Sequence, residues 1–102
     1  MIADVWLVSE NRMIDFYRRD TGLDQMAREL WAAGAYRRQG PSVVTEFAGE
    51  DAAEEVFDLT NNPSRDQERA ERWGRHRSVS VGDIVAVNGQ RFLCAAQGWQ
   101  AL

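Results

Sequence analysis

The fold is decided by the stretch Arg77-Ser78-Val79-Ser80-Val81-Gly82-Asp83-Ile84-Val85-Ala86-Val87-Asn88-Gly89-Gln90-Arg91-Phe92-Leu93-Cys94, which has the pattern of a turn, a strand, a tight hairpin and a returning strand. Asn88-Gly89 suits a two-residue type I′ turn, since both central positions of that turn need a positive φ. Such a turn pairs Val87 with Gln90 and Val85 with Phe92.

Both faces of this hairpin are apolar. One face is expected to carry Val85, Val87, Phe92 and Cys94, and the other Ile84, Ala86, Arg91, Leu93 and Ala95. A ribbon that is apolar on both faces is expected at the centre of a sheet that is covered from both sides.

The other predicted strands are Ala3–Val8, an apolar run, and Val43–Phe47, which follows an expected loop over 35–42 that contains Gly40 and Pro41. The hairpin strands are expected over Ser80–Val87 and Gln90–Ala96, and the tail from 98 to 102 suggests one more short strand.

Helices are predicted over 22–33 and 51–59, where apolar residues recur at helical spacing, and more weakly over 9–19. Thr21 with Asp24, and Asp51 with Glu54, have the spacing of capping pairs. Gly34 suits the end of the first of these helices. Asn62 followed by Pro63 is expected to start a further helix, which Gly74 ends.

These elements predict an α+β fold: a small, mostly antiparallel sheet with a C-terminal Asn-Gly hairpin and two to three helices packed on it. The alternative is a small β-barrel with helical insertions, because a Val-Gly-Asp turn that leads into a strand also occurs in such barrels. With 102 residues and no linker-like tract, the chain is predicted to be a single domain.

The segment from 42 to 102 combines Ser-Val-Ser-Val-Gly-Asp-Ile-Val, Arg-Phe-Leu-Cys and a terminal Gly-Trp-Gln-Ala-Leu, with Asn62-Pro63 upstream. With these motifs the segment resembles YodL-like domains, a family of small uncharacterised bacterial modules often encoded on plasmids and phages. The resemblance implies a related fold and an origin on a mobile element, but no catalytic residues.

The charge and residue composition of the chain argue against several classes of function. The net charge is −4, every basic residue is an arginine, and Cys94 is the one cysteine. An acidic chain is a poor general binder of nucleic acid, which needs several free basic groups to contact phosphates. No secretory or membrane-spanning pattern is present, so a cytoplasmic location is expected.

The segment from 65 to 77 differs from the acidic chain as a whole, because its five arginines outnumber its three acids. It could form a strip that contacts phosphates, with a tryptophan for base stacking. It could equally be a solvated helix held by the i,i+4 pairs Glu68–Arg72 and Glu71–Arg75. The candidate contact residues are Arg65, Arg69, Arg72, Trp73, Arg75, His76, Arg77 and Trp99.

Trp6 and Trp31 are expected in the core, whereas Trp73 and Trp99, beside glycines, are expected to be partly exposed. An exposed aromatic residue near arginines suits a protein interface as well as a base-stacking platform.

No pattern of catalytic, cofactor-binding or metal-binding residues stands out, so the chain is predicted not to be an enzyme. A nucleophile and base pair of Cys94 and His76 is the alternative, but Cys94 is expected as a packed residue within a strand. Asp83 is expected to bond backbone N–H groups of its own turn.

Two functions remain. The favoured one is a non-enzymatic interaction or accessory module that binds a host or mobile-element protein, or associates with itself. The alternative is a nucleic-acid-binding module that uses the arginines from 65 to 77.

Overall fold

The computed structural model describes residues 1–19 and 21–102, which form one antiparallel sheet of five strands and four α-helices. The strands are β1 (Ile2–Val8), β2 (Tyr36–Val44), β3 (Ile84–Val87), β4 (Gln90–Cys94) and β5 (Trp99–Ala101). The helices are α1 (Glu10–Arg18), α2 (Leu23–Ala32), α3 (Gly49–Asn61) and α4 (Asp66–Arg72), with a 3-10 turn at Pro63–Arg65 before α4.

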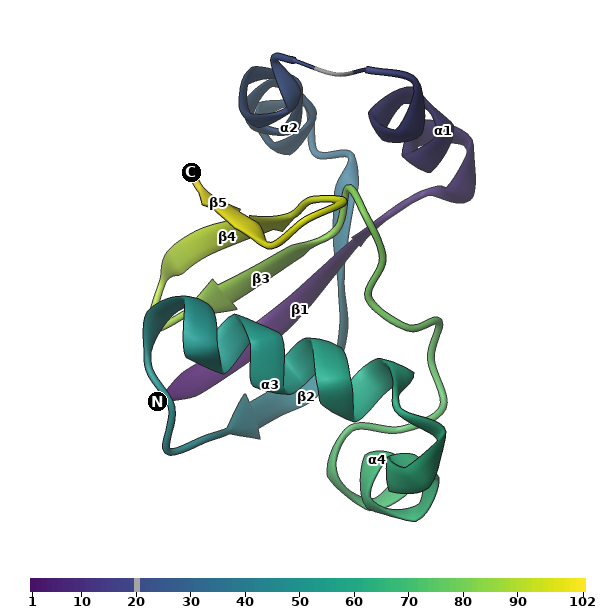
Figure 1. The fold of residues 1–102 in the computed structure, drawn as a ribbon, viewed down its shortest axis with the longest axis vertical. Helices are drawn as coiled ribbons and strands as arrows, with labels where there is room; N and C mark the ends of the chain where they lie inside the picture. The colour runs from purple at the N-terminus through teal and green to yellow at the C-terminus, as the bar shows by residue number, and fades with distance from the viewer. Residues whose placement is uncertain (20) are drawn as a thin grey trace.

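The fold is therefore α+β, as predicted, with four helices in place of two to three. The spatial order of the strands is β2-β1-β3-β4-β5, and β2 and β5 form the two edges of an open sheet (Figure 1). The alternative of a closed barrel is wrong.

The hairpin of β3 and β4 has the register expected from its Asn-Gly turn. Val87 pairs with Gln90 and Val85 with Phe92, and Asn88 and Gly89 have φ values of 48° and 86°. The Asn88 side chain also accepts a hydrogen bond from the Ile2 N–H at 2.8 Å, which ties the turn to β1. All four residues of β3 are buried, so this strand is central, as its two apolar faces indicated.

α3 covers one face of the sheet, and side chains of α1 and α2 pack on the other. Figure 1 shows α3 lying across one face, and α1 and α2 beyond one end of the strands. The core under α3 includes Val5, Val43, Val56, Leu59, Trp73, Val85 and Phe92. The core on the other face includes Val8, Phe16, Met26, Ala27, Tyr36, Ile84 and Leu93, with Trp6 and Trp31 partly buried against it.

The loop predicted over 35–42 is wrong, because β2 already begins at Tyr36. Gln39 pairs with Val5 and Val43 with Ala3, so three residues of β2 lie opposite Asp4 alone. Gly40, with φ +71°, and Pro41 lie in this bulge rather than in a loop. A bulge accommodates both residue types in an edge strand, which explains why the sequence pattern was misleading. The strand ends at Val44 and not at Phe47.

Both predicted capping pairs are wrong. Gly22 precedes α2 and Ala48 precedes α3, and neither helix has a side-chain bond at its start. Asp51 therefore lies inside the first turn of α3, where the helix dipole favours a carboxylate without a capping bond. The third start is confirmed, because the Asn62 side chain accepts a hydrogen bond from the Ser64 N–H at 2.9 Å.

Candidate functional site

Arg65 lies at the centre of an ion-pair cluster between α3 and α4. Its guanidinium contacts Glu55 at 2.6 Å, Asp58 at 2.8 Å and Glu68 at 2.8 Å, and only 18% of its side chain is exposed. Hydrogen bonds from Arg65 and then from Arg72 lower the pKa of Glu68 from 4.5 to about 2. Arg65 is thus neutralised by three carboxylates of its own chain.

Arg69 and Arg72 bind backbone carbonyls. Arg69 donates to the carbonyls of Leu59 (3.2 Å) and Asn62 (3.3 Å), at the end of α3, where helical carbonyls lack partners within the helix. It also pairs with Asp66 at 2.6 Å. Arg72 pairs with Glu68 at 2.6 Å and donates to the Val44 carbonyl at 2.7 Å. Both arginines therefore fix α4 to its neighbours.

Trp73 is buried, with 2% of its surface exposed, so the prediction of a partly exposed residue is wrong. Its indole N–H donates to the Gln39 carbonyl at 3.0 Å. The ring packs so tightly on the bulge of β2 that a Cβ added at Gly40 would lie 2.4 Å from Trp73 Nε1. The absence of a side chain at Gly40 makes this contact possible.

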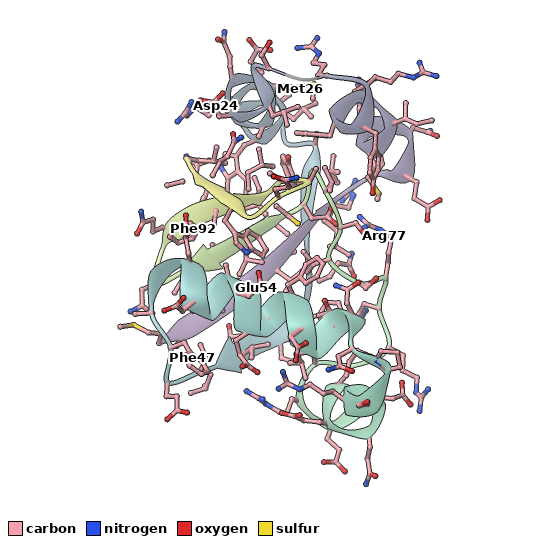
Figure 2. All side chains as sticks on the ribbon, in the orientation of Figure 1. Asp24, Met26, Phe47, Glu54, Arg77 and Phe92 are labelled. Carbon is pink, nitrogen blue, oxygen red and sulfur yellow. The ribbon has the colours of Figure 1, made fainter. Side chains whose placement is uncertain are left out.

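Arg77 binds the buried carboxylate of Asp83 with both terminal nitrogens, at 2.8 and 3.0 Å, and also donates to the Val8 carbonyl at 2.6 Å (Arg77 is labelled in Figure 2). The hydrogen bonds from Arg77 to Asp83 raise the pKa of the guanidinium. Asp83, with 0% exposure, also accepts from the N–H groups of Val8 (2.9 Å) and Ser80 (2.8 Å). Its bond to Ser80 matches the predicted turn role, whereas its link to β1 is long-range and was not visible in the sequence.

Arg75 and His76 are the two exposed residues of the predicted contact set. The predicted Glu71–Arg75 pair does not form between these described residues; Glu71 accepts from Gln67 at 3.4 Å instead. The His76 ring meets the Trp73 ring edge-on at 4.8 Å between centroids. The segment from 65 to 77 thus presents two exposed basic side chains rather than a continuous strip.

Trp99 lies apart from this segment, on β5. Its indole N–H donates to Glu54 on α3 at 2.9 Å, and its ring meets Phe57 edge-on at 6.2 Å. Trp99 is half-buried, in line with the expected partial exposure.

Cys94 is packed in β4 with 4% exposure, and burial raises the pKa of its thiol from 9.0 to about 12. The hydrogen bond that its thiol makes goes to the Ala95 carbonyl at 3.9 Å, while His76 contacts Trp73 and Gly74. A thiol with this pKa is a poor nucleophile near neutral pH.

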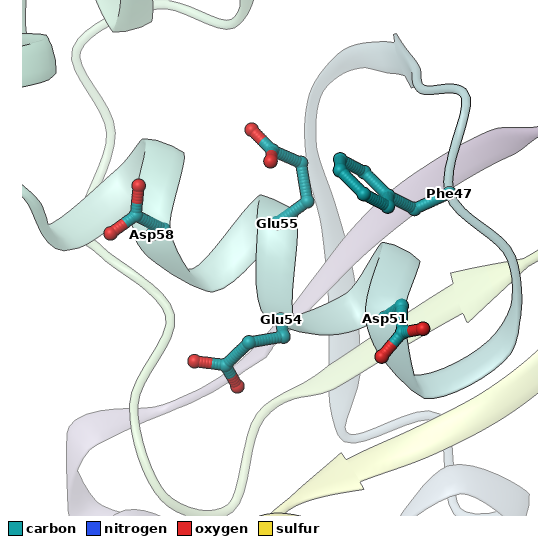
Figure 3. A pocket seen from close by; sticks show the side chains of 5 residues that line it. All are labelled: Phe47, Asp51, Glu54, Glu55 and Asp58. Carbon is teal, nitrogen blue, oxygen red and sulfur yellow. The ribbon is translucent and has the colours of Figure 1, made fainter.

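An open hollow of about 490 Å³ lies on the outer side of α3. It is lined by Phe47 and by Asp51, Glu54, Glu55 and Asp58, and in Figure 3 the ring of Phe47 points toward the helix beside Glu55. Phe47 is 43% exposed, so an aromatic ring borders four carboxylates at the surface.

The sequence analysis missed this hollow. The four acids have the spacing i, i+3, i+4 and i+7 of a single helix face, which was visible. The sequence did not reveal the position of Phe47, because Phe47 was predicted to lie in a strand, whereas that strand ends at Val44.

Comparisons with known proteins add no relative. A scan against protein-family models found no match, and searches of the curated proteins and of the solved structures found none either. The resemblance to YodL-like domains therefore stays a prediction.

The described residues, 1–19 and 21–102, include no cluster of three or more His, Cys, Asp or Glu side chains able to hold a metal ion. They also include no helix long and apolar enough to span a membrane.

Proposed function

We propose that this chain is a non-enzymatic protein-binding module, which takes a basic segment of a partner protein on the acidic face of α3 beside Phe47. The observation that carries the proposal is the hollow formed by Phe47, Asp51, Glu54, Glu55 and Asp58. An exposed aromatic ring supplies an apolar anchor, and the carboxylates around it favour arginine or lysine side chains.

The arginines support this choice over binding to nucleic acid. Arg65, Arg69, Arg72 and Arg77 already contact carboxylates and carbonyls of this chain. A phosphate would have to replace those contacts. A basic peptide would approach Asp51, which has no ion-pair partner within residues 1–19 and 21–102, and Glu54, which accepts one bond from Trp99. Glu55 and Asp58 already pair with Arg65, so they attract a basic partner less.

The proposal includes a cytoplasmic location and an origin on a phage or plasmid. The second part is tested by the neighbouring genes: phage or plasmid genes would support it, and an operon of metabolic enzymes would contradict it.

The direct test is selection of random peptides, displayed on phage, against the immobilised protein. We expect enriched peptides that carry arginine or lysine next to an aromatic or aliphatic residue. Phe47→Ala and Asp51→Asn should each weaken the binding of the enriched peptides about tenfold, since each removes a central contact.

The matched controls are Ile14→Ala and Glu29→Gln, which remove an exposed apolar side chain from α1 and an exposed carboxylate from α2. Binding should be unchanged in both. Absence of enrichment, or equal loss in the control variants, would refute the proposed surface.

A further inference from the structure

The two edges of the sheet differ in a way that points to a second binding surface. At β2, the bulge around Pro41 interrupts the edge, and side chains of this protein already bond two of its carbonyls, Trp73 that of Gln39 and Arg72 that of Val44. Edge strands with bulges, prolines and covered backbone groups resist pairing with another strand. The β2 edge is thus protected.

The β5 edge has no such protection. The Gly98 carbonyl accepts from the Ala95 N–H at 3.0 Å, and the Leu102 N–H donates to the Arg91 carbonyl at 2.9 Å, so these groups point toward β4. Backbone groups of an antiparallel strand alternate in direction, which turns the N–H and C=O of Trp99 and Ala101 outward. No other group in residues 1–19 and 21–102 bonds these outward atoms.

Hollows flank this edge on both faces of the sheet. On the α3 face, a hollow of about 210 Å³ is lined by Glu54, Phe57, Cys94, Ala95, Ala96, Gly98 and Trp99. On the opposite face, one of about 350 Å³ is lined by residues that include Phe16, Tyr17, Leu23, Val81 and Gln100. Both hollows share Ala95 and Ala96, at the turn between β4 and β5.

We propose that β5 takes an extended segment of a partner protein as a sixth strand of the sheet. The backbone of the segment would bond Trp99 and Ala101, while its side chains would enter the two hollows alternately, the arrangement known for strand addition. Side chains toward α3 meet Glu54 and are therefore basic. Side chains toward the other face meet Tyr17, Leu23 and the basic Arg19, so apolar side chains suit that face better than basic ones.

A second copy of this chain is a less suitable occupant. Pairing of β5 with β5 would bring a second chain of net charge −4 to an edge bordered by Glu54. Like charges oppose such an approach, whereas a basic segment gains from it. This inference goes beyond the proposed function, because it concerns the backbone edge of β5, which shares only Glu54 with the hollow at Phe47.

The probe is a capped peptide of roughly eight residues, a common strand length, in which arginine and valine alternate. Its control has the same composition with the arginines and valines in separate blocks. Amide hydrogen exchange of the ¹⁵N-labelled protein reports on the outward N–H groups. We expect Trp99 and Ala101 to exchange rapidly in the free protein and about tenfold or more slowly with the alternating peptide, while the blocked peptide has no effect.

Two variants at position 101 distinguish the contribution of the backbone N–H to peptide binding from that of the side chain. Ala101→Pro removes an outward donor and leaves the bonds to β4 intact, and it should weaken peptide binding about tenfold. Ala101→Val retains the donor and should bind as the wild type does. Both variants are first shown to retain the wild-type thermal unfolding transition.

The inference is overturned if the peptide leaves Trp99 and Ala101 unprotected, or if Ala101→Pro and Ala101→Val bind it equally well. Protection that rises with protein concentration in the absence of peptide would also overturn it, because it would show self-pairing. Phe47→Ala should leave the protection of the Trp99 and Ala101 N–H groups by the alternating peptide unchanged, so failure here and failure of the proposed function are distinguishable.

Discussion

Replacement of Asp83 tests how the protein uses its most deeply buried charge. The carboxylate has 0% exposure and accepts four hydrogen bonds, two from Arg77 and one each from the N–H groups of Val8 and Ser80. Breaking a buried ion pair costs about 3–5 kcal/mol, and each buried donor left unpaired costs about 1–3 kcal/mol. These costs overlap, so we expect Asp83→Ala to lower the free energy of unfolding by about 5 kcal/mol.

Such a loss matches the whole stability of a weakly stable domain. Asp83→Asn keeps one acceptor oxygen but places an amide NH₂ group against the guanidinium. We expect this variant to lower the free energy of unfolding by about 3 kcal/mol. The assay is urea unfolding followed by tryptophan fluorescence. Circular dichroism shows whether Asp83→Ala is folded at all.

Asp58→Ala is the matched control. Asp58 also pairs with an arginine at 2.8 Å, but 49% of its side chain is exposed. Exposed pairs contribute about 0–1 kcal/mol, so this variant should unfold close to the wild type. Equal effects of Asp83→Asn and Asp58→Ala, or a loss below about 1 kcal/mol for Asp83→Asn, would refute the reasoning.

Three further predictions concern single contacts. An NMR titration of the Glu68 carboxyl should give a midpoint near 2, so its contribution to stability is full above pH 4.5 and is lost as the pH falls toward 2; Arg65→Met should raise the midpoint, and an unchanged midpoint would contradict the pairing. Gly40→Ala should lower the free energy of unfolding by roughly 2–4 kcal/mol, because the new Cβ meets the Trp73 ring and φ is +71°; a wild-type unfolding curve would show that the contact is loose. The Cys94 thiol, with a pKa near 12, should react with a disulfide reagent at pH 8 only as fast as the protein opens, whereas rapid reaction of the native protein would show an accessible thiolate.

The sequence predicted those parts of the fold that depend on local pattern. The Asn88-Gly89 turn, the two apolar faces of its strands and the apolar stripe of α2 were all legible, since each follows from the spacing of neighbouring residues. The first half of β2 was wrongly predicted as a loop, because a glycine followed by a proline suits a bulge as well as a loop.

The candidate contact residues were harder to interpret, because their partners are distant in the sequence. Arg72 reaches Val44, Trp73 reaches Gln39 and Arg77 reaches Val8. Only the i,i+4 pair of Glu68 with Arg72 was visible in advance. Whether an arginine-rich segment forms a free basic surface therefore depends on the acids and carbonyls that only the folded chain brings close to it.

The central claim is that Arg65, Arg69, Arg72 and Arg77 serve the fold and that recognition takes place on the acidic face of α3. Fluorescence anisotropy tests it with two labelled ligands, a DNA duplex at low salt and a basic peptide obtained by selection. The account predicts no DNA binding, and peptide binding that Phe47→Ala weakens about tenfold. DNA binding whose salt dependence becomes shallower when Arg75 is replaced by alanine, together with peptide binding unaffected by Phe47→Ala, would contradict it.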